Sequence, residues 1–361
     1  MENNKQIDAI SKIENELKKL EDKKFNVFFY ILDSKGNASG SLEYIYETAF
    51  QLHKMGYNVK MLHNESEFIG VADWLGEKYA SLPHANIEND KINVSSSDFL
   101  FIPEIFSNVM TQTKKLPCKR VALLQNFNYL TEFIPVGVTW DDLGIYDVIT
   151  TTKKQEDMIK EVFPNIRSHI VRPSINPVFR EEVEPKKLIV NIVAKNQSDV
   201  NRIVKPFYWK APIYKWITFR DLRGLSRDEF ANALRESAIT VWVDTDTYFG
   251  YSPLEAMKCG NIVIGKIPEV IPEWMEEKDE LKDNGLWFSE MKDVHILLAN
   301  VINAWIYDKI PDVLIENIKS MENTYSIDEQ INDIKKVYVN ELFEQRKNEF
   351  KVLLAQFNKK A

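Results

Sequence analysis

The chain has 361 residues, of which 44% are hydrophobic and 28% are charged, and this composition is typical of a globular protein with room for two domain cores. The formal net charge of −8 gives no global attraction to nucleic acid or to an anionic membrane, although 46 basic residues leave room for a local basic patch. Only two cysteines occur, Cys118 and Cys259, which excludes a disulfide scaffold and indicates a reducing compartment.

The first 23 residues begin with a charged and polar stretch, Met-Glu-Asn-Asn-Lys-Gln, which does not have the pattern of a secretory signal. No apolar run reaches the roughly 20 residues that a membrane span requires. We therefore expect a cytoplasmic protein whose contact with a membrane is at most peripheral. Residues 5–22 place Ile and Leu at spacings of three and four among Glu and Lys, which predicts an amphipathic helix. This helix is expected to pack on the body of the protein or to form a homodimer contact.

Residues 24–175 carry the pattern of a doubly wound α/β domain. An apolar strand at 25–32 is followed by a Gly- and Ser-rich turn, a helix at 42–55 and a second strand at 58–62. The turn lacks the G-x-G-x-x-G spacing of a dinucleotide site. Further strands are expected at 99–102, 120–124 and 148–150.

A second domain is expected at 186–325. A proline-bearing extended segment followed by a charged run predicts a linker at 173–187, and a new sheet begins at Leu188. Residues 326–361 show a long helical pattern with few breakers. The sequence thus predicts two Rossmann-like domains, preceded by one helix and followed by others.

Polar residues follow three predicted elements of the first domain at the edge where open α/β sheets bind ligands. They are Gly40 and Ser41 in the turn after the first strand, Glu104 after the strand at 99–102, and Gln125 and Asn126 after the strand at 120–124. We expect them to line a ligand cleft, where they would contact an acceptor or, in the case of the turn with Gly40 and Ser41, a donor phosphate. The alternative is that the glycine supplies an ordinary turn and that the polar side chains cap helices and turns.

The most informative segment is 247–260, T-Y-F-G-Y-S-P-L-E-A-M-K-C-G. It follows an apolar strand at 238–243 and precedes another at 261–265, so it predicts a parallel crossover unit with a tight loop at the carboxyl edge of the sheet. A glycine there allows close approach of the backbone to a ligand, and a new helix offers N–H groups to an anion. Glu255 is expected in the first turn of that helix, where it can accept hydrogen bonds from sugar hydroxyls. The segment predicts a nucleotide-sugar pocket.

This segment resembles the signature E-G-F-G-L-P-P-L-E-A-M-A-C-G of retaining glycosyltransferases of the GT-B fold, group-one type (glycosyltransferase family four-like). The positions that match are Phe249, Gly250, Pro253, Leu254, Glu255, Ala256, Met257, Cys259 and Gly260. Residues 217–238 resemble the Ser-capped helix that leads into this signature, and 325–330 resemble the start of the C-terminal helix. The resemblance implies two doubly wound domains that face one another across a cleft, with the C-terminal helix crossing back to the first domain.

The resemblance also implies roles for individual residues. Glu255 would hold the ribose of the donor. Lys195, just after the first strand of the second domain, would face its diphosphate, with Arg220 and Arg223 as weaker candidates. The first glutamate of the family's pair is replaced by Thr247, so Thr247, helped by Asp246, would contact the transferred sugar. Glu269 is one of two candidates for a further donor contact, beside Glu273. The loop whose backbone would contact the phosphates and sugar of the donor comprises Phe249, Gly250, Tyr251 and Ser252.

No metal site is predicted, because the five histidines show no paired ligand spacing and the cysteines are isolated from them. The spelling Asp244-Thr245-Asp246 lies next to the signature and is interpreted as part of the loop. Backbone N–H groups and Lys195 would therefore neutralise the leaving diphosphate in place of a cation. No cofactor is expected beyond a nucleotide-sugar donor, which would be UDP- or GDP-linked.

The resulting hypothesis is a glycosyltransferase that moves a sugar from a nucleotide-diphosphate sugar to an acceptor hydroxyl, with retention and without metal. The acceptor could be a glycan, a lipid-linked sugar, a protein or a modified nucleobase. The replacement at Thr247 and the N-terminal helix motivate the alternative, a catalytically weak or inactive GT-B subunit that binds a partner. An epimerase or a phosphorylase is disfavoured by the group-one signature and because no lysine resembles a pyridoxal phosphate site.

Overall fold

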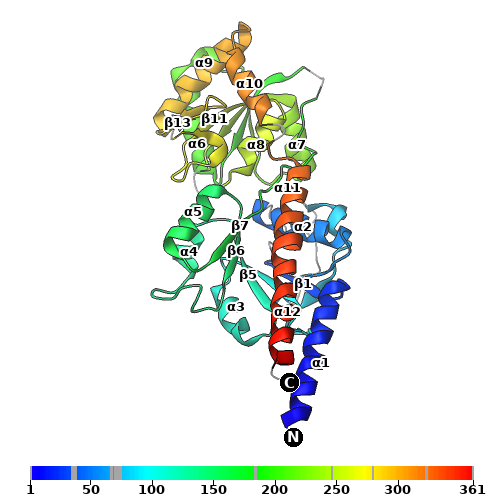
Figure 1. The fold of residues 1–361 in the computed structure, drawn as a ribbon. Helices are drawn as coiled ribbons and strands as arrows, with labels where there is room; N and C mark the ends of the chain where they lie inside the picture. Colours follow the sequence, from blue (N-terminus) through cyan, green and yellow to red (C-terminus); the bar gives the residue numbers. More distant parts are fainter. Residues whose placement is uncertain are drawn as a thin grey trace. The chain divides into compact units, whose positions relative to one another are not determined.

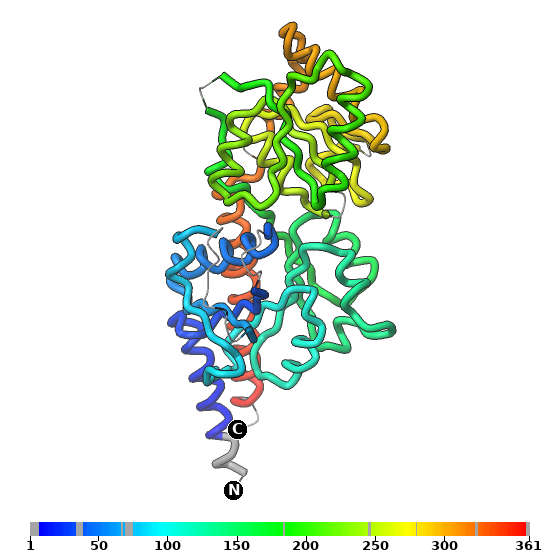
Figure 2. Tube along the Cα trace, turned by 180° about the vertical axis from the view of Figure 1, so that it is seen from behind, coloured from blue at the N-terminus to red at the C-terminus, as the bar shows by residue number. Residues whose placement is uncertain are grey.

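The computed structural model describes residues 2–33, 39–65, 68, 75–182, 185–244, 247–278, 280–321 and 324–359. The chain divides into two compact units: unit 1 comprises Met1–Arg172 and Gln330–Ala361, and unit 2 comprises Pro173–Glu329. Each unit is built on one parallel sheet with helices around it (Figure 1), and the trace can be followed from behind in Figure 2. The α/β class predicted from the sequence is confirmed.

The sheet of unit 1 has seven parallel strands in the order β3-β2-β1-β4-β5-β6-β7. The central strand β1 pairs with β2 on one side and with β4 on the other, with Val27 opposite both Val59 and Phe99. The strand order reverses between β1 and β4, which is where a doubly wound sheet binds its ligand. The strands are β1 (Asn26–Tyr30), β2 (Asn58–His63), β3 (His84–Asn86), β4 (Phe99–Pro103), β5 (Lys119–Leu124), β6 (Asp147–Thr150) and β7 (Arg167–Ile170).

Helices cover both faces of this sheet, which explains why central strands such as β1 and β4 are apolar on both faces. Val27 and Phe29 of β1 belong to one buried cluster and Phe28 and Tyr30 to another, because successive side chains point to opposite faces. The helical segments between the strands are α2 (Gly40–Lys54), η2 (Glu77–Tyr79), α3 (Ser107–Gln112), η3 (Thr113–Lys115), α4 (Asn128–Phe133) and α5 (Lys153–Val162).

The C-terminal helices α11 (Ile327–Ile334), η7 (a π-helical segment, Lys335–Phe343) and α12 (Glu344–Lys359) belong mostly to unit 1, so the chain returns to its first unit as predicted. The ring of Phe343 lies 5.0 Å from that of Phe25 and 4.7 Å from that of Phe99. The N-terminal helix α1 (Glu2–Glu21) lies beside α12 (Figure 1), and Leu20 on it is fully buried. Of the two expectations for this helix, packing on the body is the one observed.

The sheet of unit 2 has five parallel strands in the order β14-β11-β10-β8-β9. If the five strands are numbered along the chain and the sheet is read from its β9 edge, the order is 2-1-3-4-5. The switch point of this order lies between β8 and β10. The strands are β8 (Lys187–Val193), β9 (Thr218–Asp221), β10 (Ser237–Trp242), β11 (Ile262–Lys266) and β14 (Leu286–Phe288), and a separate antiparallel hairpin joins β12 (Glu276–Glu277) to β13 (Glu280–Leu281).

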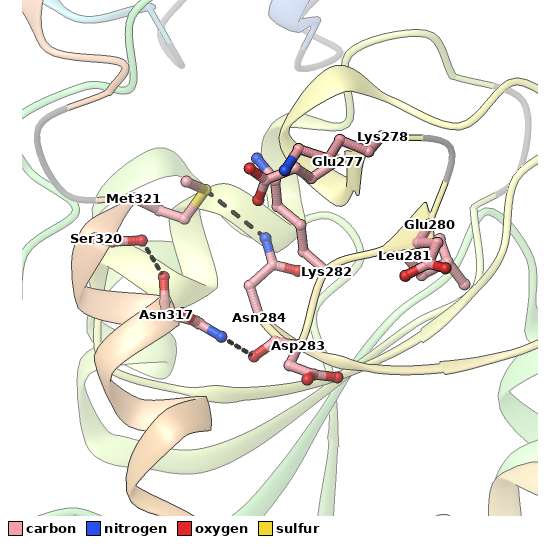
Figure 3. A pocket seen from close by; sticks show the side chains of 10 residues that line it. All are labelled: Glu277, Lys278, Glu280, Leu281, Lys282, Asp283, Asn284, Asn317, Ser320 and Met321. Carbon is pink, nitrogen blue, oxygen red and sulfur yellow. Dashed lines mark hydrogen bonds between the residues drawn. The ribbon is translucent and has the colours of Figure 1, made fainter.

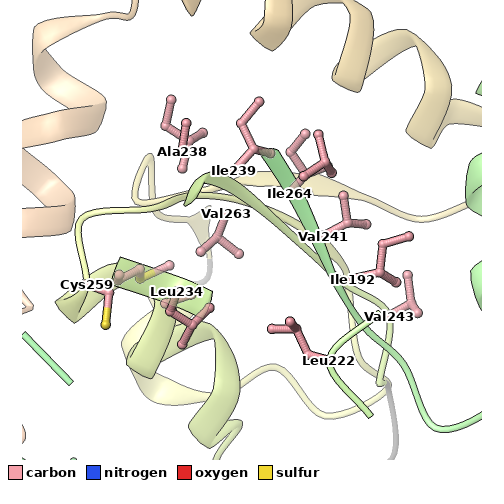
Figure 4. Packing of buried hydrophobic residues seen from close by; sticks show 14 of the residues in the cluster. Ile192, Leu222, Leu234, Ala238, Ile239, Val241, Val243, Cys259, Val263 and Ile264 are labelled. Atoms are coloured by element: carbon pink, nitrogen blue, oxygen red, sulfur yellow. The ribbon is translucent and has the colours of Figure 1, made fainter. Parts of the chain in front are cut away.

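The core of unit 2 forms where strand side chains such as Val241 and Val263 pack near Leu234 of helix α7 (Figure 4). Helix α7 begins with a reciprocal cap, in which the Ser226 hydroxyl accepts from the Glu229 N–H and the Glu229 carboxylate accepts from the Ser226 N–H. This is the Ser-capped helix expected from the sequence. The helical segments are α6 (Gln197–Lys210), η4 (Pro212–Tyr214), α7 (Arg227–Glu236), α8 (Tyr251–Lys258), η5 (Glu273–Met275), η6 (Met291–Asp293), α9 (Val294–Ile306) and α10 (Asp312–Ser320).

The segment predicted as a linker, 173–187, starts inside unit 2 instead of between the units. Ile175 and Phe179 are 2% and 4% exposed and belong to the core of unit 2. The Ile175 N–H also donates to the carbonyl of Tyr325 at 2.9 Å. The prolines around these residues suggested an extended tether, but the apolar residues between them are buried. In the described part of the chain, no helix combines the length and the apolar character needed to cross a bilayer.

The aromatic packing of Phe343 predicts that the C-terminal helices stabilise unit 1 specifically. Phe343→Ala removes a buried ring and should lower the free energy of unfolding of unit 1 by about 3–5 kcal/mol. Hydrogen exchange should show lost protection in β1 and β4 and unchanged protection in β8 and β10. Val352→Ala in α12, whose side chain is 56% exposed, is the matched control and should have little effect. Equal losses in both sheets would contradict this assignment.

Candidate functional site

An ion pair marks the switch point of the unit 2 sheet. Lys195 lies two residues after β8 and Asp244 lies two residues after β10, and the Lys195 Nζ is 3.1 Å from the Asp244 Oδ1. Because β8 and β10 are neighbours, their carboxyl ends bring these two side chains together. The lysine side chain is 54% exposed, so the pair contributes little to stability and its ammonium stays accessible to a stronger anion. Lys195 is thus placed at the predicted edge.

Residues 247–250, directly before α8, are held by hydrogen bonds around Gly250. This glycine has φ +72°, a left-handed conformation, and its N–H donates to the Thr247 Oγ1 at 3.0 Å. The indole N–H of Trp274 donates to the carbonyl of Phe249 at 2.5 Å. A Cβ at Gly250 would lie 3.3 Å from the ring of Trp274 and 3.6 Å from that of Trp242. The close packing and the dihedral together explain why glycine is required here.

These contacts change the expected roles of two loop residues. The side chain of Phe249 is 5% exposed and packs edge-on against Tyr251 and Tyr325, and its carbonyl is already bonded, so it is a structural residue of the loop. The hydroxyl of Thr247 closes the turn by accepting from Gly250. Threonine at this position therefore has a local structural use that a glutamate would not reproduce in the same way.

Helix α8 begins at Tyr251, directly after the loop, so its N–H-rich end lies at the carboxyl edge of the sheet. Tyr251 and Ser252 are its first two residues and are partly exposed. Glu255 is the fifth residue of the helix and so begins the second turn; the expectation of a first-turn position was wrong by about one residue. The cause is that the helix starts immediately after the left-handed Gly250. The Glu255 side chain is partly exposed.

A third strand end approaches the same loop. Glu269 follows β11 and is exposed. The pKa of the Tyr248 hydroxyl is raised, firstly by burial of the hydroxyl and secondly by the negative charge of the Glu269 carboxylate. This electrostatic effect requires the two side chains to be near one another. Residues after β8, β10 and β11 therefore gather at one edge of unit 2. Asp246, the other predicted sugar contact, lies outside the described residues.

The two arginines near β9 are placed differently. The Arg220 Nη2 donates to the Glu236 Oε2 at 2.8 Å, and Glu236 ends α7 before the amino end of β10. Arg220 is thus not brought together with Lys195. Arg223 lies beyond the carboxyl end of β9, and its guanidinium donates to Asp221 and, at 2.5 Å, to the Gln197 Oε1 at the start of α6. Of the two weaker candidates, Arg223 is the better-placed cation.

In unit 1 the predicted acceptor residues form one connected group. The Glu104 Oε1 accepts from the N–H of Gln125 at 3.1 Å and from the N–H of Asn126 at 2.8 Å. The Gln125 Nε2 donates to the carbonyl of Ser41 at 3.2 Å, and Gly40 is the first residue of α2. The ends of β4 and β5 and the start of α2 are therefore tied together at the carboxyl edge of this sheet. Asn126 also accepts from the N–H of Asn128, as a turn-forming residue does.

Glu104 is a carboxyl group in an environment that disfavours its charge. Its side chain is 3% exposed, and burial raises its pKa from the ordinary 4.5 to about 7, although the backbone donors of Asn126 and Gln125 act in the opposite direction. The group therefore changes charge close to neutral pH. Its two hydrogen bonds show that it positions the segment after β5.

Two cavities in the described part of unit 2 lie away from these edges. One of about 420 Å³ is formed by the β12–β13 hairpin and α10, and its side chains include Lys278, Lys282 and Asn317 (Figure 3). Another of about 560 Å³ lies by Lys186 and Ile262, at the amino end of the parallel strands. None of the residues that line either cavity is a predicted site residue. Among the described residues, no three His, Cys, Asp or Glu side chains gather in a way that could hold a metal ion.

The raised pKa of Glu104 predicts a pH dependence of stability. Between about pH 4.5 and about pH 7 the folded protein holds a proton that the unfolded chain has lost, so the free energy of unfolding falls as the pH rises. Over this pH interval the free energy of unfolding should fall by an amount on the order of 3 kcal/mol. Glu104→Gln should remove this component, whereas Glu161→Gln, an exposed glutamate in α5, should not. The free energy of unfolding can be measured at each pH by chemical denaturation. If it depends on pH in the same way in the wild type and in Glu104→Gln, the prediction is wrong.

The bond from Trp274 to Phe249 predicts a specific loosening of the loop. Trp274→Phe leaves a buried carbonyl without its donor and should cost about 1–3 kcal/mol, with faster hydrogen exchange in residues 247–254. Trp287→Phe is the matched control, since the Trp287 indole contacts Trp274 but donates to Lys282. Comparable exchange in both variants over these residues would show that the hydrogen bond does not hold the loop.

Comparisons with known proteins bear on this architecture. No family model matches the chain. A curated protein named alpha-1,6-glucosyltransferase, from Actinobacillus pleuropneumoniae serotype 7 (strain AP76), is 24% identical over 221 residues, which are 59% of this chain and 64% of that protein. The match thus spans less than two thirds of the relative's length.

Solved structures resemble the chain over most of its length. The pneumococcal O-GlcNAc transferase GtfA, in complex with UDP and GlcNAc, has a TM-score of 0.64 at 9% identity and covers 89% of this chain and 99% of its own. Anabaena Alr3699/HepE, in complex with UDP-glucose, has a TM-score of 0.62 at 11% identity, with 87% and 99% covered. TarM has a TM-score of 0.60 at 10% identity, with 88% and 98% covered. At such identities the likeness establishes architecture: this chain has the GT-B glycosyltransferase fold.

Proposed function

We propose that this protein is a glycosyltransferase that moves a sugar from a nucleotide-diphosphate sugar to an acceptor hydroxyl. The observation that carries the proposal is the switch point of unit 2, where Lys195 and the loop before α8 lie at the carboxyl ends of neighbouring strands. The GT-B fold and the relative named as a glucosyltransferase support it. A hexosyl donor carried by UDP or GDP is the preferred substrate.

The donor diphosphate would bind between Lys195 and the amino ends of α6 and α8. A diphosphate carries more charge than the carboxylate of Asp244, so it can replace Asp244 as the partner of the Lys195 ammonium. Helix amino ends add N–H donors to the same anion. These groups gain most when the diphosphate leaves, because negative charge then accumulates on it. This is how the site could promote transfer without a metal ion.

The remaining parts of the donor are assigned to α8 and its neighbours. Glu255 would accept hydrogen bonds from the ribose hydroxyls, while Thr247 and Glu269 would lie near the sugar. In the reaction the bond from the anomeric carbon to the diphosphate oxygen breaks and a bond to the acceptor oxygen forms. The departing diphosphate would take the acceptor proton, with retention at the anomeric carbon.

Unit 1 would supply the acceptor site through Glu104, Gln125 and Asn126. The acceptor could be a glycan, a lipid-linked sugar, a protein or a modified nucleobase. We also propose a cytoplasmic location. The second candidate function is a binding subunit with little catalysis, and it is favoured by one observation: the Thr247 hydroxyl is used to close the loop.

Nucleotide binding and turnover of the full chain test both candidates. We expect UDP or GDP to raise the melting temperature, and the corresponding sugar nucleotides to be hydrolysed slowly in the absence of acceptor. Glu255→Ala should weaken binding at least tenfold, about 1.4 kcal/mol, as measured by calorimetry. Glu316→Ala, an exposed glutamate of α10, is the charge-matched control and should bind as the wild type does.

Binding without hydrolysis or transfer would favour the binding subunit. Absence of binding to either diphosphate, or full binding by Glu255→Ala, would overturn the donor-site assignment.

A further inference from the structure

A basic and aromatic surface covers the end of α6, the short helix η4 and the turn before β9. Residues 200–219 contain four basic side chains and no Asp or Glu, within a chain whose net charge is −8. We call this the Trp–Lys surface, and it consists of Trp209, Ile213, Trp216, Lys205, Lys210 and Lys215. It lies at the β9 edge of the unit 2 sheet and takes no part in the proposed donor site.

The apolar members of this surface are unusually exposed. The side chains of Trp209, Ile213 and Trp216 are 74%, 75% and 59% exposed, whereas Trp242 and Trp274 in the same unit are 2% exposed. Single exposed apolar residues are common, but three within eight residues, two of them tryptophan, are not explained by folding alone. They indicate contact with something outside the unit.

The neighbouring residues hold these side chains outward. The ring of Tyr214 stacks on that of Phe207 at 5.9 Å, and Phe207 is fully buried. The Tyr208 hydroxyl donates to the carbonyl of Ile217 at 2.7 Å. The exposed residues therefore lie between anchored residues along the chain. The surface is presented by a fixed backbone and needs no rearrangement to make contact.

Helix α9 extends the surface on one side. The Tyr214 hydroxyl donates to the Asn303 Oδ1, and Ile306, one turn further along α9, is 45% exposed, as is its neighbour Tyr307 at 68%. Helix α9 contains no Asp, Glu, Lys or Arg. Next to it lie the exposed Asp308 and Lys309, of opposite charge.

The lysines of the surface are available to an external anion. Within the described residues, no ion pair joins Lys205, Lys210 or Lys215 to a carboxylate. The flanking arginines differ, since Arg202 pairs with Asp199 and Arg220 with Glu236. The three unpaired lysines thus give the surface a net positive charge.

We propose that the Trp–Lys surface docks unit 2 onto a lipid bilayer that carries anionic headgroups. Tryptophan and tyrosine favour the interface between headgroups and acyl chains, and lysines beside them extend toward the phosphates. Lysine is depleted in the cores of protein–protein interfaces, so its interleaving with tryptophan favours a bilayer over a protein partner. Attraction of lysines to anionic lipid adds to the apolar contact. The overall charge of −8 makes binding depend on this local surface.

Sedimentation of the full chain with vesicles tests the proposal. We expect binding to phosphatidylcholine vesicles that contain roughly a quarter phosphatidylglycerol, and weak binding to phosphatidylcholine alone. Trp209→Ser with Trp216→Ser, and separately Lys205→Gln with Lys210→Gln and Lys215→Gln, should each reduce the bound fraction at least about fivefold. Raising the salt from about 0.1 M to about 0.5 M should weaken the binding of the wild type.

Matched controls test whether vesicle binding depends on this surface or only on the overall charge and apolar content of the protein. Lys91→Gln with Lys115→Gln and Lys335→Gln makes the same charge change on exposed residues of unit 1, and Val136→Ser with Val162→Ser removes exposed apolar groups there. Both controls should bind as the wild type does. Circular dichroism should be used to verify that each variant is folded. The proposal is overturned if the wild type binds neither vesicle, which would leave a protein partner as the occupant, or if the surface variants and the controls bind alike.

Discussion

Residues 247–250, which lead into α8, are held in place because the left-handed Gly250 packs against the rings of Trp242 and Trp274. Polar backbone atoms of this segment are bonded internally, the N–H of Gly250 to Thr247 and the carbonyl of Phe249 to Trp274. The start of α8 is therefore fixed relative to the end of β10. Every proposed role of Glu255 and of the amino end of α8 depends on this constraint.

The two units use the same sheet geometry for different purposes. In unit 2 the switch point brings Lys195 to the loop, and the charged and polar groups there are partly exposed. In unit 1 the corresponding edge is organised by a buried carboxyl, Glu104, which ties the segment after β5 to β4. An exposed cation suits the capture of an anionic donor, whereas a buried carboxyl suits the positioning of a neutral acceptor.

Much of this architecture could be predicted from the sequence. The apolar runs at 99–102 and 120–124 became β4 and β5, and the segment 247–260 became a loop and α8, because strong local patterns coincide there with tertiary packing. Strands β3, β7 and β9 were not predicted, because they are short and polar and are specified by pairing with a neighbour.

The site was predictable only where a side chain follows a strand directly. Lys195 and Glu104 were found in this way, and both lie at carboxyl edges. Glu255 was predicted in the first turn of the helix and is its fifth residue, and the sequence did not indicate that the side chain of Phe249 is buried. Both features depend on where the left-handed glycine ends the loop. The role of Trp274 had no local signal, because it arises from a hydrogen bond across 25 residues of sequence.

The most direct test of the central claim is a hydrogen-exchange footprint of UDP-glucose and GDP-mannose on the full chain. The account predicts that the ligand that binds slows exchange in residues 193–199 and 247–256. Protection confined to the cavity at residues 277–284 and 317–321, with the loop before α8 unchanged, would contradict it.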